Sequence, residues 1–298
     1  MPELPEVEHA ARTLRRLALG RRVLRVLADQ RARRLFRPDG SAALVRALEG
    51  ARLAAVDRRG KQLLLTFEAG GGVLGVVSHL GMTGKWEAGP AWSPGPAVRP
   101  PGAGRRVRAR PPAAPALPPH VRAALLLEDG TALHYDDPRM FGRLRLVPGA
   151  DFAAVAEVAA LGPDPLHDGI DAAALAAGLG ATRRPVKVAL LDQALLAGVG
   201  NIHAAEACWR ARLDPRRRAD RLTRAEVAAL ARGLRATFRF ALARLDGPDI
   251  QYLEEGGDNP FHVYGRAGAR CRHPGCGGAV RRIVQAQRAT FFCPRCQR

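Results

Sequence analysis

The chain has 298 residues, 47% of them hydrophobic, so it is long enough to bury a core and to form two or three domains. No apolar run approaches the roughly 20 residues that cross a bilayer, and the first residues lack the basic and apolar regions of a signal peptide. These absences predict a cytoplasmic protein with no membrane partner. The formal net charge of +19 predicts a polyanionic partner such as nucleic acid.

Arginine supplies nearly all of the positive charge. The chain has 44 arginines and only three lysines, Lys61, Lys85 and Lys187. Arginine stays charged in proteins, whereas lysine can lose its proton. A lysine retained in such a chain is therefore a candidate for chemistry that arginine cannot perform, and chance retention is the alternative for any single one.

The first half of the chain is expected to form one helix followed by short strands. Residues 5–19 carry apolar side chains at helical spacing. Alternating β-type runs follow, and Asp129-Gly130 marks a hairpin. The expected strands are 23–27, 53–57, 62–67, 73–78, 121–128, 131–135 and 143–147. The pattern predicts an antiparallel sandwich, with a barrel as the alternative, in a domain over residues 1–150.

Residues 86–119 are dense in proline, glycine, alanine and arginine. This composition predicts a long mobile insertion in the first domain. From residue 151 the pattern becomes helical, with expected helices at 152–160, 171–179, 185–196, 203–210 and 223–245. Thr223 and Glu226 have the spacing of a capping box at the start of the last helix. Residues 151–262 are predicted to form a second domain and residues 263–298 a third.

Four cysteines stand in two pairs within this short tail. Four residues separate Cys271 from Cys276, two separate Cys293 from Cys296, and sixteen lie between the pairs. This is the spacing of a four-thiolate zinc site, and two disulfides are the weaker alternative in a cytosolic chain. His273 is a competing ligand. Because four protein ligands leave no open position for water, the spacing predicts one structural Zn²⁺, whose binding helps to fold the tail.

Pro2 and Glu3 follow the initiator methionine. If Met1 is removed, Pro2 becomes a secondary amine beside a carboxylic acid. An α-amino group has a reference pKa of about 7.7 to 8.0, against about 10.4 for lysine, so it can attack an aldehyde or a sugar C1′ and form a Schiff base near neutral pH. On these residues alone, the simpler interpretation is that Pro2 and Pro5 begin a helix.

Several further motifs share one order along the chain with this amino terminus and the cysteines. They are Arg59-Gly60-Lys61, His79-Leu80-Gly81-Met82-Thr83-Gly84, Asp137-Pro138-Arg139-Met140-Phe141-Gly142, Leu161-Gly162-Pro163, Gly198-Val199-Gly200-Asn201-Ile202, Val263-Tyr264-Gly265-Arg266 and Gln287-Arg288-Ala289-Thr290. In this combination, and over nearly its whole length, the chain resembles the formamidopyrimidine-DNA glycosylase family. The set of Met82, Arg139 and Phe141 favours the formamidopyrimidine branch over the related endonuclease VIII branch.

The resemblance implies an α+β multidomain fold: an N-terminal antiparallel β-sandwich with an N-terminal helix, a helix-two-turn-helix domain and a C-terminal zinc-finger hairpin. It implies a monomeric, nucleoid-associated enzyme of base-excision repair. This enzyme would remove oxidised bases from damaged double-stranded DNA through a Schiff base at Pro2, then nick the strand by β,δ-elimination. The alternatives are a non-catalytic DNA-damage binding protein and an endonuclease VIII-like glycosylase that prefers oxidised pyrimidines.

The resemblance also implies roles for single residues. Pro2 would be the nucleophile, Glu3 the acid and Lys61 a phosphate contact that assists the eliminations. Glu206 would support the amino-terminal site. The residues expected to contact DNA are Glu6, Met82, Arg139, Phe141, Lys187, Asn201, Tyr264 and Arg288.

Two sets of these residues would each act together. Met82, Arg139 and Phe141 would fill the gap left by the extruded base, while Asn201 and Arg288 would hold one phosphate. Among the departures from the family, two concern the reaction site. The segment between Leu245 and Val263 is shorter than expected for the loop that closes over 8-oxoguanine, so the preferred lesion stays open. His203 also stands where the family usually has tyrosine.

Overall fold

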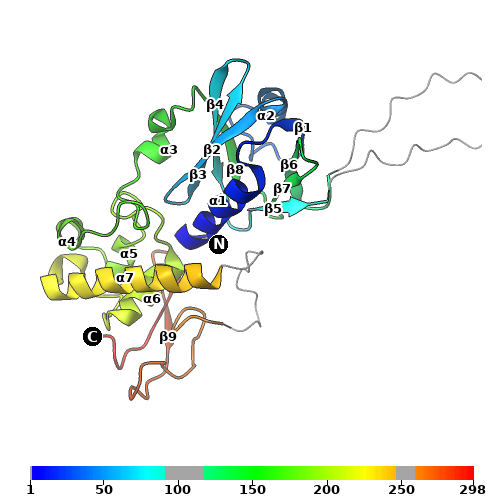
Figure 1. Ribbon diagram of the computed structural model, residues 1–298. Coiled ribbons are helices and arrows are strands. Elements are labelled where there is room, and N and C mark those ends of the chain that lie inside the picture. The colour runs from blue at the N-terminus through cyan, green and yellow to red at the C-terminus, as the bar shows by residue number, and fades with distance from the viewer. Residues whose placement is uncertain (1, 91–116, 246–258) are drawn as a thin grey trace, which may run out of the picture. The chain divides into compact units, whose positions relative to one another are not determined.

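The computed structural model describes residues 2–90, 117–245 and 259–298, and Figure 1 shows their helices and strands. Most of the predicted insertion and most of the short segment before Val263 lie outside the described residues. The chain divides into two compact units. One consists of Met1–Ala11, Asp57–Leu64 and Asp151–Arg298, and the other of Arg12–Val56 and Leu65–Ala150. The domain boundaries after residues 150 and 262 stay predictions.

Two four-stranded antiparallel sheets form most of the second unit, as the predicted sandwich requires. One has the order β1-β6-β7-β5, made of β1 (Val23–Ala28), β6 (Val121–Leu127), β7 (Ala132–Asp136) and β5 (Lys85–Gly89). The other has the order β2-β3-β4-β8, made of β2 (Arg52–Arg59), β3 (Gln62–Ala69), β4 (Gly72–His79) and β8 (Arg143–Pro148). The predicted N-terminal helix is α1 (Leu4–Ala18).

The sequence pattern missed two elements of this unit. One is the helix α2 (Ser41–Leu48), and the other is strand β5. Trp86 in β5 is buried, and its Nε1 donates to Ser78 Oγ of the other sheet at 3.0 Å. Residues 86–89 therefore belong to the sheet and not to an insertion. The proline- and arginine-rich composition of the residues that follow had masked this short strand.

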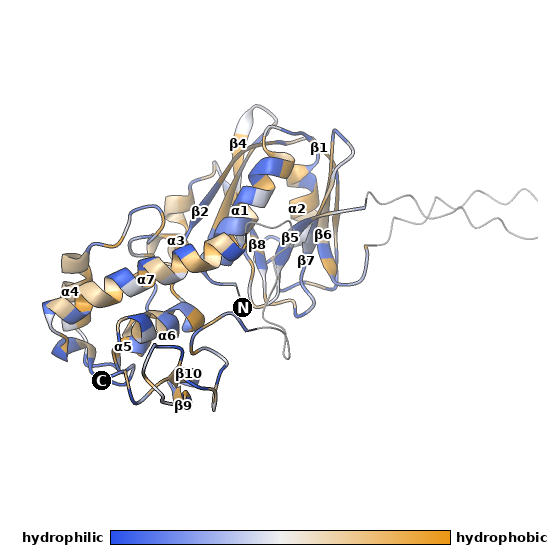
Figure 2. Cartoon of the chain, turned by 60° about the horizontal axis from the view of Figure 1, so that its bottom comes forward, coloured by the Kyte–Doolittle hydropathy of each residue, from blue (hydrophilic) through white to orange (hydrophobic). Residues whose placement is uncertain are grey.

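The first unit contains the helices of the second half of the chain. Its long helix α7 (Arg224–Arg244) packs on α6 (Asn201–Arg210). The predicted capping box is confirmed, because the Thr223 and Glu226 side chains each bind the backbone N–H of the other. Gly233 lets the two helices approach closely, since a Cβ there would lie 2.7 Å from Ala207 O. Figure 2 shows apolar and polar positions alternating along α7 at helical spacing.

The remaining helices are short. They are η1 (Phe152–Ala154), α3 (Ala156–Ala159), α4 (Ala172–Gly180), α5 (Val186–Ala189) and η2 (Ala219–Arg221). The predicted helix over 152–160 is interrupted by Val155, whose backbone is extended. The predicted helix over 185–196 is wrong, because α5 ends at Ala189 and turns follow. Asp192 stabilises those turns by accepting a hydrogen bond from the backbone N–H of Ala194 at 3.1 Å.

The tail forms a two-stranded antiparallel hairpin of β9 (Arg281–Gln285) and β10 (Arg288–Phe292). Ala286 and Gln287 both have positive φ, at 45° and 58°, as the two-residue turns of twisted hairpins require. Arg288 therefore directly follows the hairpin turn, near its tip. No helix among the described residues is both long enough and apolar enough to span a membrane.

Candidate functional site

Glu3 is held by the N-terminal end of α6. Its carboxylate is buried and accepts hydrogen bonds from the backbone N–H of Ile202 at 2.8 Å and of His203 at 3.1 Å. The first N–H groups of a helix lack partners within the helix and favour a negative charge. Gly200 makes the contact possible, because a Cβ at that position would lie 2.2 Å from Glu3 Cδ. The local fold thus presents a buried carboxylate beside Pro2.

Glu6 and Leu4 fix the segment that carries Glu3. The Glu6 carboxylate accepts a hydrogen bond from the backbone N–H of Glu3 at 2.9 Å. The backbone N–H of Leu4 donates to Gly198 O at 3.2 Å. Gly198 has φ +88°, and a Cβ there would lie 2.5 Å from Leu4 Cδ1. The Gly198-Val199-Gly200 segment is therefore shaped to receive the amino terminus.

Lys61 reaches the same segment from the β2–β3 turn. Its Nζ donates to Val199 O at 3.1 Å. Burial lowers the pKa of Lys61, and the negative charge of Glu3 acts in the opposite direction. An ammonium group that has been largely removed from water interacts strongly with the charges that remain near it.

Buried ion pairs anchor the turn that carries Lys61. Arg58 is almost fully buried and pairs with both Glu8 and Asp164. The same Asp164 accepts a hydrogen bond from the backbone N–H of Gly60 at 2.7 Å. These contacts fix the residues on either side of the turn, so the position of Lys61 depends on them.

Lys187 and Asn201 form a second buried pair close to Glu3. Lys187 is fully buried and its Nζ donates to Asn201 Oδ1. Burial, reinforced by the charge of Arg288, lowers the pKa of Lys187 to about 8. Asn201 Nδ2 donates to Ala289 O at 2.9 Å, next to Arg288 on the zinc hairpin. One asparagine thus joins α5, α6 and the hairpin.

Glu206 has a different place from the one expected. Its buried carboxylate accepts hydrogen bonds from the backbone N–H groups of His262, Val263 and Tyr264 and pairs with Arg210. Burial opposes ionisation, but the hydrogen bonds from His262, Val263 and Tyr264 outweigh it and lower the pKa of Glu206 to about 2. All of these bonds go to residues 262–264 and Arg210, so Glu206 supports the segment around Tyr264 rather than Pro2 or Glu3 directly.

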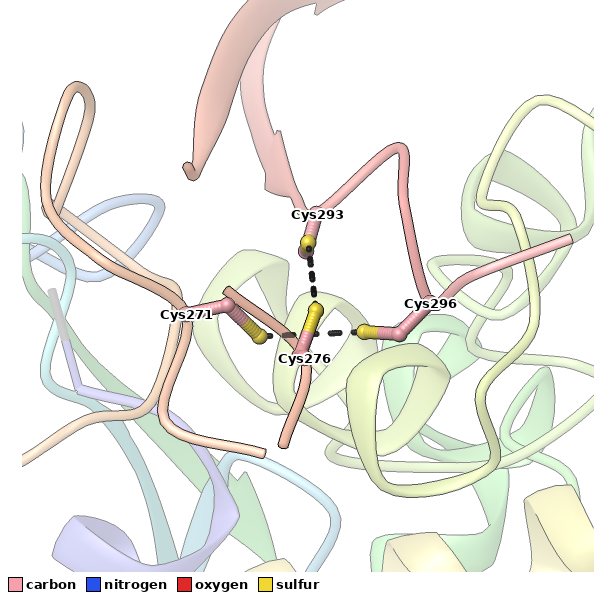
Figure 3. A group of neighbouring side chains, drawn as sticks. All are labelled: Cys271, Cys276, Cys293 and Cys296. Atoms are coloured by element: carbon pink, nitrogen blue, oxygen red, sulfur yellow. Dashed lines mark hydrogen bonds between the residues drawn. The ribbon is translucent and has the colours of Figure 1, made fainter. Parts of the chain in front are cut away.

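The four tail cysteines converge as zinc ligands would (Figure 3). The Sγ atoms of Cys271 and Cys296 are 3.7 Å apart, those of Cys276 and Cys293 are 3.6 Å apart, and all four lie within 4.8 Å of one another. Tetrahedral zinc with Zn–S bonds of about 2.3 Å separates its sulfurs by about 3.8 Å. The cluster therefore fits one structural Zn²⁺ with no open coordination position.

His273 lies beside the cluster. Its Nδ1 is 3.1 Å from Cys296 Sγ, and its ring stacks on Trp209 of α6 with centroids 3.8 Å apart. Trp209 Nε1 donates to Cys271 Sγ at 3.4 Å. Cys208 is outside the cluster, and burial raises its pKa to about 12, as expected of an inert core thiol.

In the second unit, two loops present the residues expected to fill the gap in the DNA. Met82, Arg139 and Phe141 are all exposed, and the Arg139 guanidinium lies 5.0 Å from the Phe141 ring centroid. The buried Asp137 carboxylate joins the loops by accepting hydrogen bonds from Thr83 Oγ1 and Gly142 N, both at 2.8 Å. An exposed aromatic ring on such a rigid support is available to a partner.

Sequence reasoning missed the residues that position the site. Arg58 and Asp164 adjoin the Arg59-Gly60-Lys61 and Leu161-Gly162-Pro163 motifs, but no periodic pattern pairs two residues so far apart. Gly200 was part of a motif, yet its steric role depends on Glu3, almost 200 residues away. Trp209 sits in an ordinary helical pattern, so its contact with a cysteine could not be expected.

Three family models match consecutive parts of the chain. They describe the formamidopyrimidine-DNA glycosylase N-terminal domain over residues 1–144, the formamidopyrimidine-DNA glycosylase H2TH domain over 161–250 and the zinc finger found in FPG and IleRS over 268–298. Formamidopyrimidine-DNA glycosylases from Paracoccus denitrificans and Thermus thermophilus are each 41% identical to the chain. The alignments cover all of this chain and 100% and 98% of those proteins.

Solved structures agree with this similarity. MutM (Fpg) from Thermus thermophilus superposes with a TM-score of 0.75 at 38% identity, covering 99% of this chain and 98% of that one. The Lactococcus lactis Fpg in complex with DNA containing N7-benzyl-Fapy-dG gives a TM-score of 0.80 at 26% identity, with both chains fully covered. The same protein with abasic-site DNA gives 0.80 at 26%, covering 99% of each chain.

Proposed function

Because the chain belongs to the formamidopyrimidine-DNA glycosylase family, we propose that Pro2, freed by removal of Met1, is the nucleophile of its reaction. The chain is a bifunctional base-excision DNA glycosylase and abasic-site lyase with one structural zinc. The observation that carries the assignment to Pro2 is the buried Glu3 carboxylate, which α6 holds directly beside it. The partner is damaged double-stranded DNA, as in the complexes of the Lactococcus lactis enzyme.

The proposed chemistry begins at the secondary amine of Pro2. The nitrogen lone pair attacks C1′ of the damaged nucleotide, and the bond to the base breaks. The base leaves with the electron pair of that bond and takes up the proton that the Pro2 nitrogen loses. As the base departs, Glu3 gives its proton to the sugar ring oxygen, the bond from C1′ to that oxygen breaks, and the ring opens to a Schiff base. Abstraction of protons from the sugar then expels the 3′ and 5′ phosphates in turn, which nicks the strand by β,δ-elimination.

The basic side chains around Glu3 would bind the backbone of the damaged strand. Lys61 is proposed to hold the phosphate beside the lesion and assist the eliminations, while Lys187 lies near the base or sugar. Asn201 and Arg288 would hold a phosphate together, which the bond from Asn201 Nδ2 to the hairpin backbone supports. Such contacts set the register of the enzyme without reading sequence.

An enzyme that acts on a base within a duplex must first extrude it. Met82, Arg139 and Phe141 are proposed to fill the resulting gap, with Arg139 facing the orphaned base. Their exposure and shared support by Asp137 favour this role. Glu6 and Tyr264 would contact the flipped nucleotide and the phosphate region, with Tyr264 held by Glu206.

The finer assignments are proposals of the same kind. Formamidopyrimidine lesions are the preferred substrate, the enzyme acts as a monomer, and it works in the cytoplasm at the nucleoid. A cleavage panel with ring-opened purine, 8-oxoguanine, oxidised pyrimidine and abasic sites tests the first. Sedimentation of the protein with and without duplex DNA tests the second, and imaging of a tagged protein in cells tests the third.

Borohydride trapping on duplex DNA tests the nucleophile. The wild-type protein should give a covalent adduct that peptide mass analysis places on residue 2, in a chain whose mass lacks Met1. Pro2→Gly should trap far less, whereas the matched change Pro5→Ala, in the same segment, should trap as the wild type does. Equal trapping by a folded Pro2→Gly protein would rule out Pro2. Salt-sensitive binding to abasic DNA without nicking would instead support the non-catalytic alternative.

A further inference from the structure

His203 is a buried histidine that faces the carboxylate of Glu3. It lies in the first turn of α6 and is fully buried. Its Nε2 is 3.8 Å from Glu3 Oε2, and this nitrogen has no hydrogen-bond partner in the part of the chain that the structure describes. On its other side, Nδ1 is 3.3 Å from Thr237 Oγ1 of α7. The ring packs against Phe238 with centroids 5.1 Å apart.

An unpaired buried nitrogen destabilises a folded protein, so its position calls for an explanation. At 3.8 Å the contact is too long for a hydrogen bond. A shift of about 1 Å by the Glu3 side chain would bring it to the usual length of a charge-assisted bond. No acceptor among the described residues lies within hydrogen-bond distance of Nε2, so the Glu3 carboxylate has no competitor there.

The surroundings indicate where the ring proton sits. If only Nδ1 carried a proton, the lone pair of Nε2 would point at the carboxylate, which is electrostatically unfavourable. The Thr237 hydroxyl can donate as well as accept. The arrangement with Nε2–H facing Glu3 and Nδ1 accepting from Thr237 satisfies both nitrogens once Glu3 moves.

We infer that His203 is a positioning residue whose Nε2–H closes onto Glu3 during base excision and stabilises the carboxylate as it forms. The inference rests on the proposed role of Glu3 as the acid. In that step the Glu3 O–H bond breaks, the proton goes to the sugar ring oxygen, and the electron pair stays on the carboxylate. His203 keeps its own proton throughout. A third donor, added to Ile202 N and His203 N, is then present when the negative charge appears.

Other charges also surround this pair and influence any pH profile. Glu6 binds the Glu3 backbone from α1, and Lys61 acts on Glu3 from the β2–β3 turn. Lys187 acts on it from α5, and Arg288 lies near both lysines. On the side of α7, the residues next to His203 are the uncharged Thr237 and Phe238. Variants of His203 and Thr237 leave every one of these charges in place. Differences between their excision rates and that of the wild type therefore report on the histidine.

Single-turnover base excision by three full-length variants tests the inference. His203→Phe fills the space without a donor and should slow excision about tenfold to a hundredfold, the effect of losing one charge-assisted hydrogen bond. The pH dependence of its excision rate should also differ from that of the wild type, because the carboxyl group has lost a donor. His203→Gln retains an N–H donor and should recover most of the rate. Thr237→Val removes the hydroxyl bound to Nδ1 and should have an intermediate effect. The affinity of each for abasic-site DNA should stay within about twofold of the wild type.

The outcomes separate this inference from the proposed function. Wild-type excision by Glu3→Gln would overturn the role of Glu3 itself. If Glu3→Gln is inactive while His203→Phe matches the wild type, only the role of His203 is overturned. Equal losses in His203→Phe and His203→Gln, with an unchanged pH profile, would show a purely structural role and also overturn it. If His203→Phe does not fold, as judged by thermal unfolding, the Gln and Thr237→Val variants decide by the same criteria.

Discussion

Lys187, which is fully buried, and Lys61, which is partly buried, stand where the chain otherwise uses arginine. Composition singled out all three lysines, and the structure brings Lys61 and Lys187 to the segment around Glu3. Burial lowers the pKa of each, and an arginine in the same surroundings would stay charged. The third lysine, Lys85, pairs with Glu87 in β5 and is a third exposed. Scarcity in the sequence thus pointed to the lysines, but only folding showed that Lys187 is fully buried.

The lowered pKa of Lys187 predicts how stability depends on pH. The group titrates near 8 in the folded protein and near 10.4 when unfolded, so between these values the unfolded chain binds more protons. Folding stability therefore rises with pH through this window, and below it burial of the charge costs up to about 3 kcal/mol. Lys187→Met should stabilise the DNA-free protein at pH 7 and lose most of this advantage by pH 10. Urea unfolding at the two pH values measures the difference.

Lys85→Met is the matched control for that measurement. Its effect on the free energy of unfolding should stay below about 1 kcal/mol at either pH, because its ion pair is partly exposed. A Lys187→Met protein that is less stable than the wild type at both pH values would contradict the prediction. It would show that the hydrogen bond from Lys187 to Asn201 outweighs the cost of burying the lysine charge.

Among the elements, α6 does the most to build the site. The N–H groups of its second and third residues bind Glu3, Asn201 at its start joins Lys187 to the zinc hairpin, and Trp209 near its end touches the zinc cluster. The helix was predicted from its pattern, as were its approximate ends and the capping box of α7. The helical pattern itself could predict none of these three connections, because each partner comes from a distant part of the chain. Only the resemblance had placed Asn201 and the zinc hairpin at one phosphate.

Two predictions of secondary structure failed for the same reason: the helix expected over 185–196 and the missed strand β5. Residues 190–196 are as apolar as a helix face requires, yet turns fixed by Asp192 replace the helix there. Strand β5 is only five residues long and precedes a proline-rich stretch. Local composition was a poor guide in both places. A side-chain hydrogen bond stabilised the turns after Ala189, and pairing with another strand formed β5.

Gly200→Ala tests the dependence of Glu3 on α6. The backbone of Gly200 is extended, so alanine itself is tolerated, but its Cβ would lie 2.2 Å from Glu3 Cδ. Glu3 must then move away from the helix N-terminus. Single-turnover excision should fall about a hundredfold, as expected when two hydrogen bonds to a carboxylate are lost. Gly180→Ala, at the end of α4 where a Cβ would contact nothing, should leave excision unchanged. Full activity in Gly200→Ala would contradict the geometry described for Glu3.

Across the whole molecule, the metal site and the charge are the features that the sequence revealed most directly. Four cysteines at zinc spacing need no long-range information, because the short tail brings its own ligands together. The net charge of +19 likewise does not depend on the fold. The location of the chemistry needed the other motifs of the chain, since Pro2 and Glu3 alone favoured a plain helix start.

Removal of zinc should disable DNA binding while leaving the helices folded. The tail depends on its metal for stability, whereas α6 and α7 pack on a separate apolar core. A chelator, or Cys293→Ser, should abolish binding to abasic-site duplex and change the fluorescence of Trp209, which contacts both Cys271 and His273. Most of the helical circular dichroism should remain. Cys208→Ala removes a cysteine outside the cluster and should bind zinc and DNA normally. Unaltered DNA binding after complete zinc removal would contradict this role of the hairpin.

The bonds from Glu3 to residues 202 and 203 also have a consequence for biosynthesis. They join positions 199 and 200 residues apart, so the ribosome makes the amino terminus long before the helix that binds it. At about 5 to 20 residues per second, the delay is roughly 10 to 40 seconds. During that interval the nascent chain carries Pro2 without the buried, correctly held carboxylate beside it. If Pro2 is the nucleophile, as we propose, its amine therefore lacks the correctly held Glu3 carboxylate until translation has passed α6.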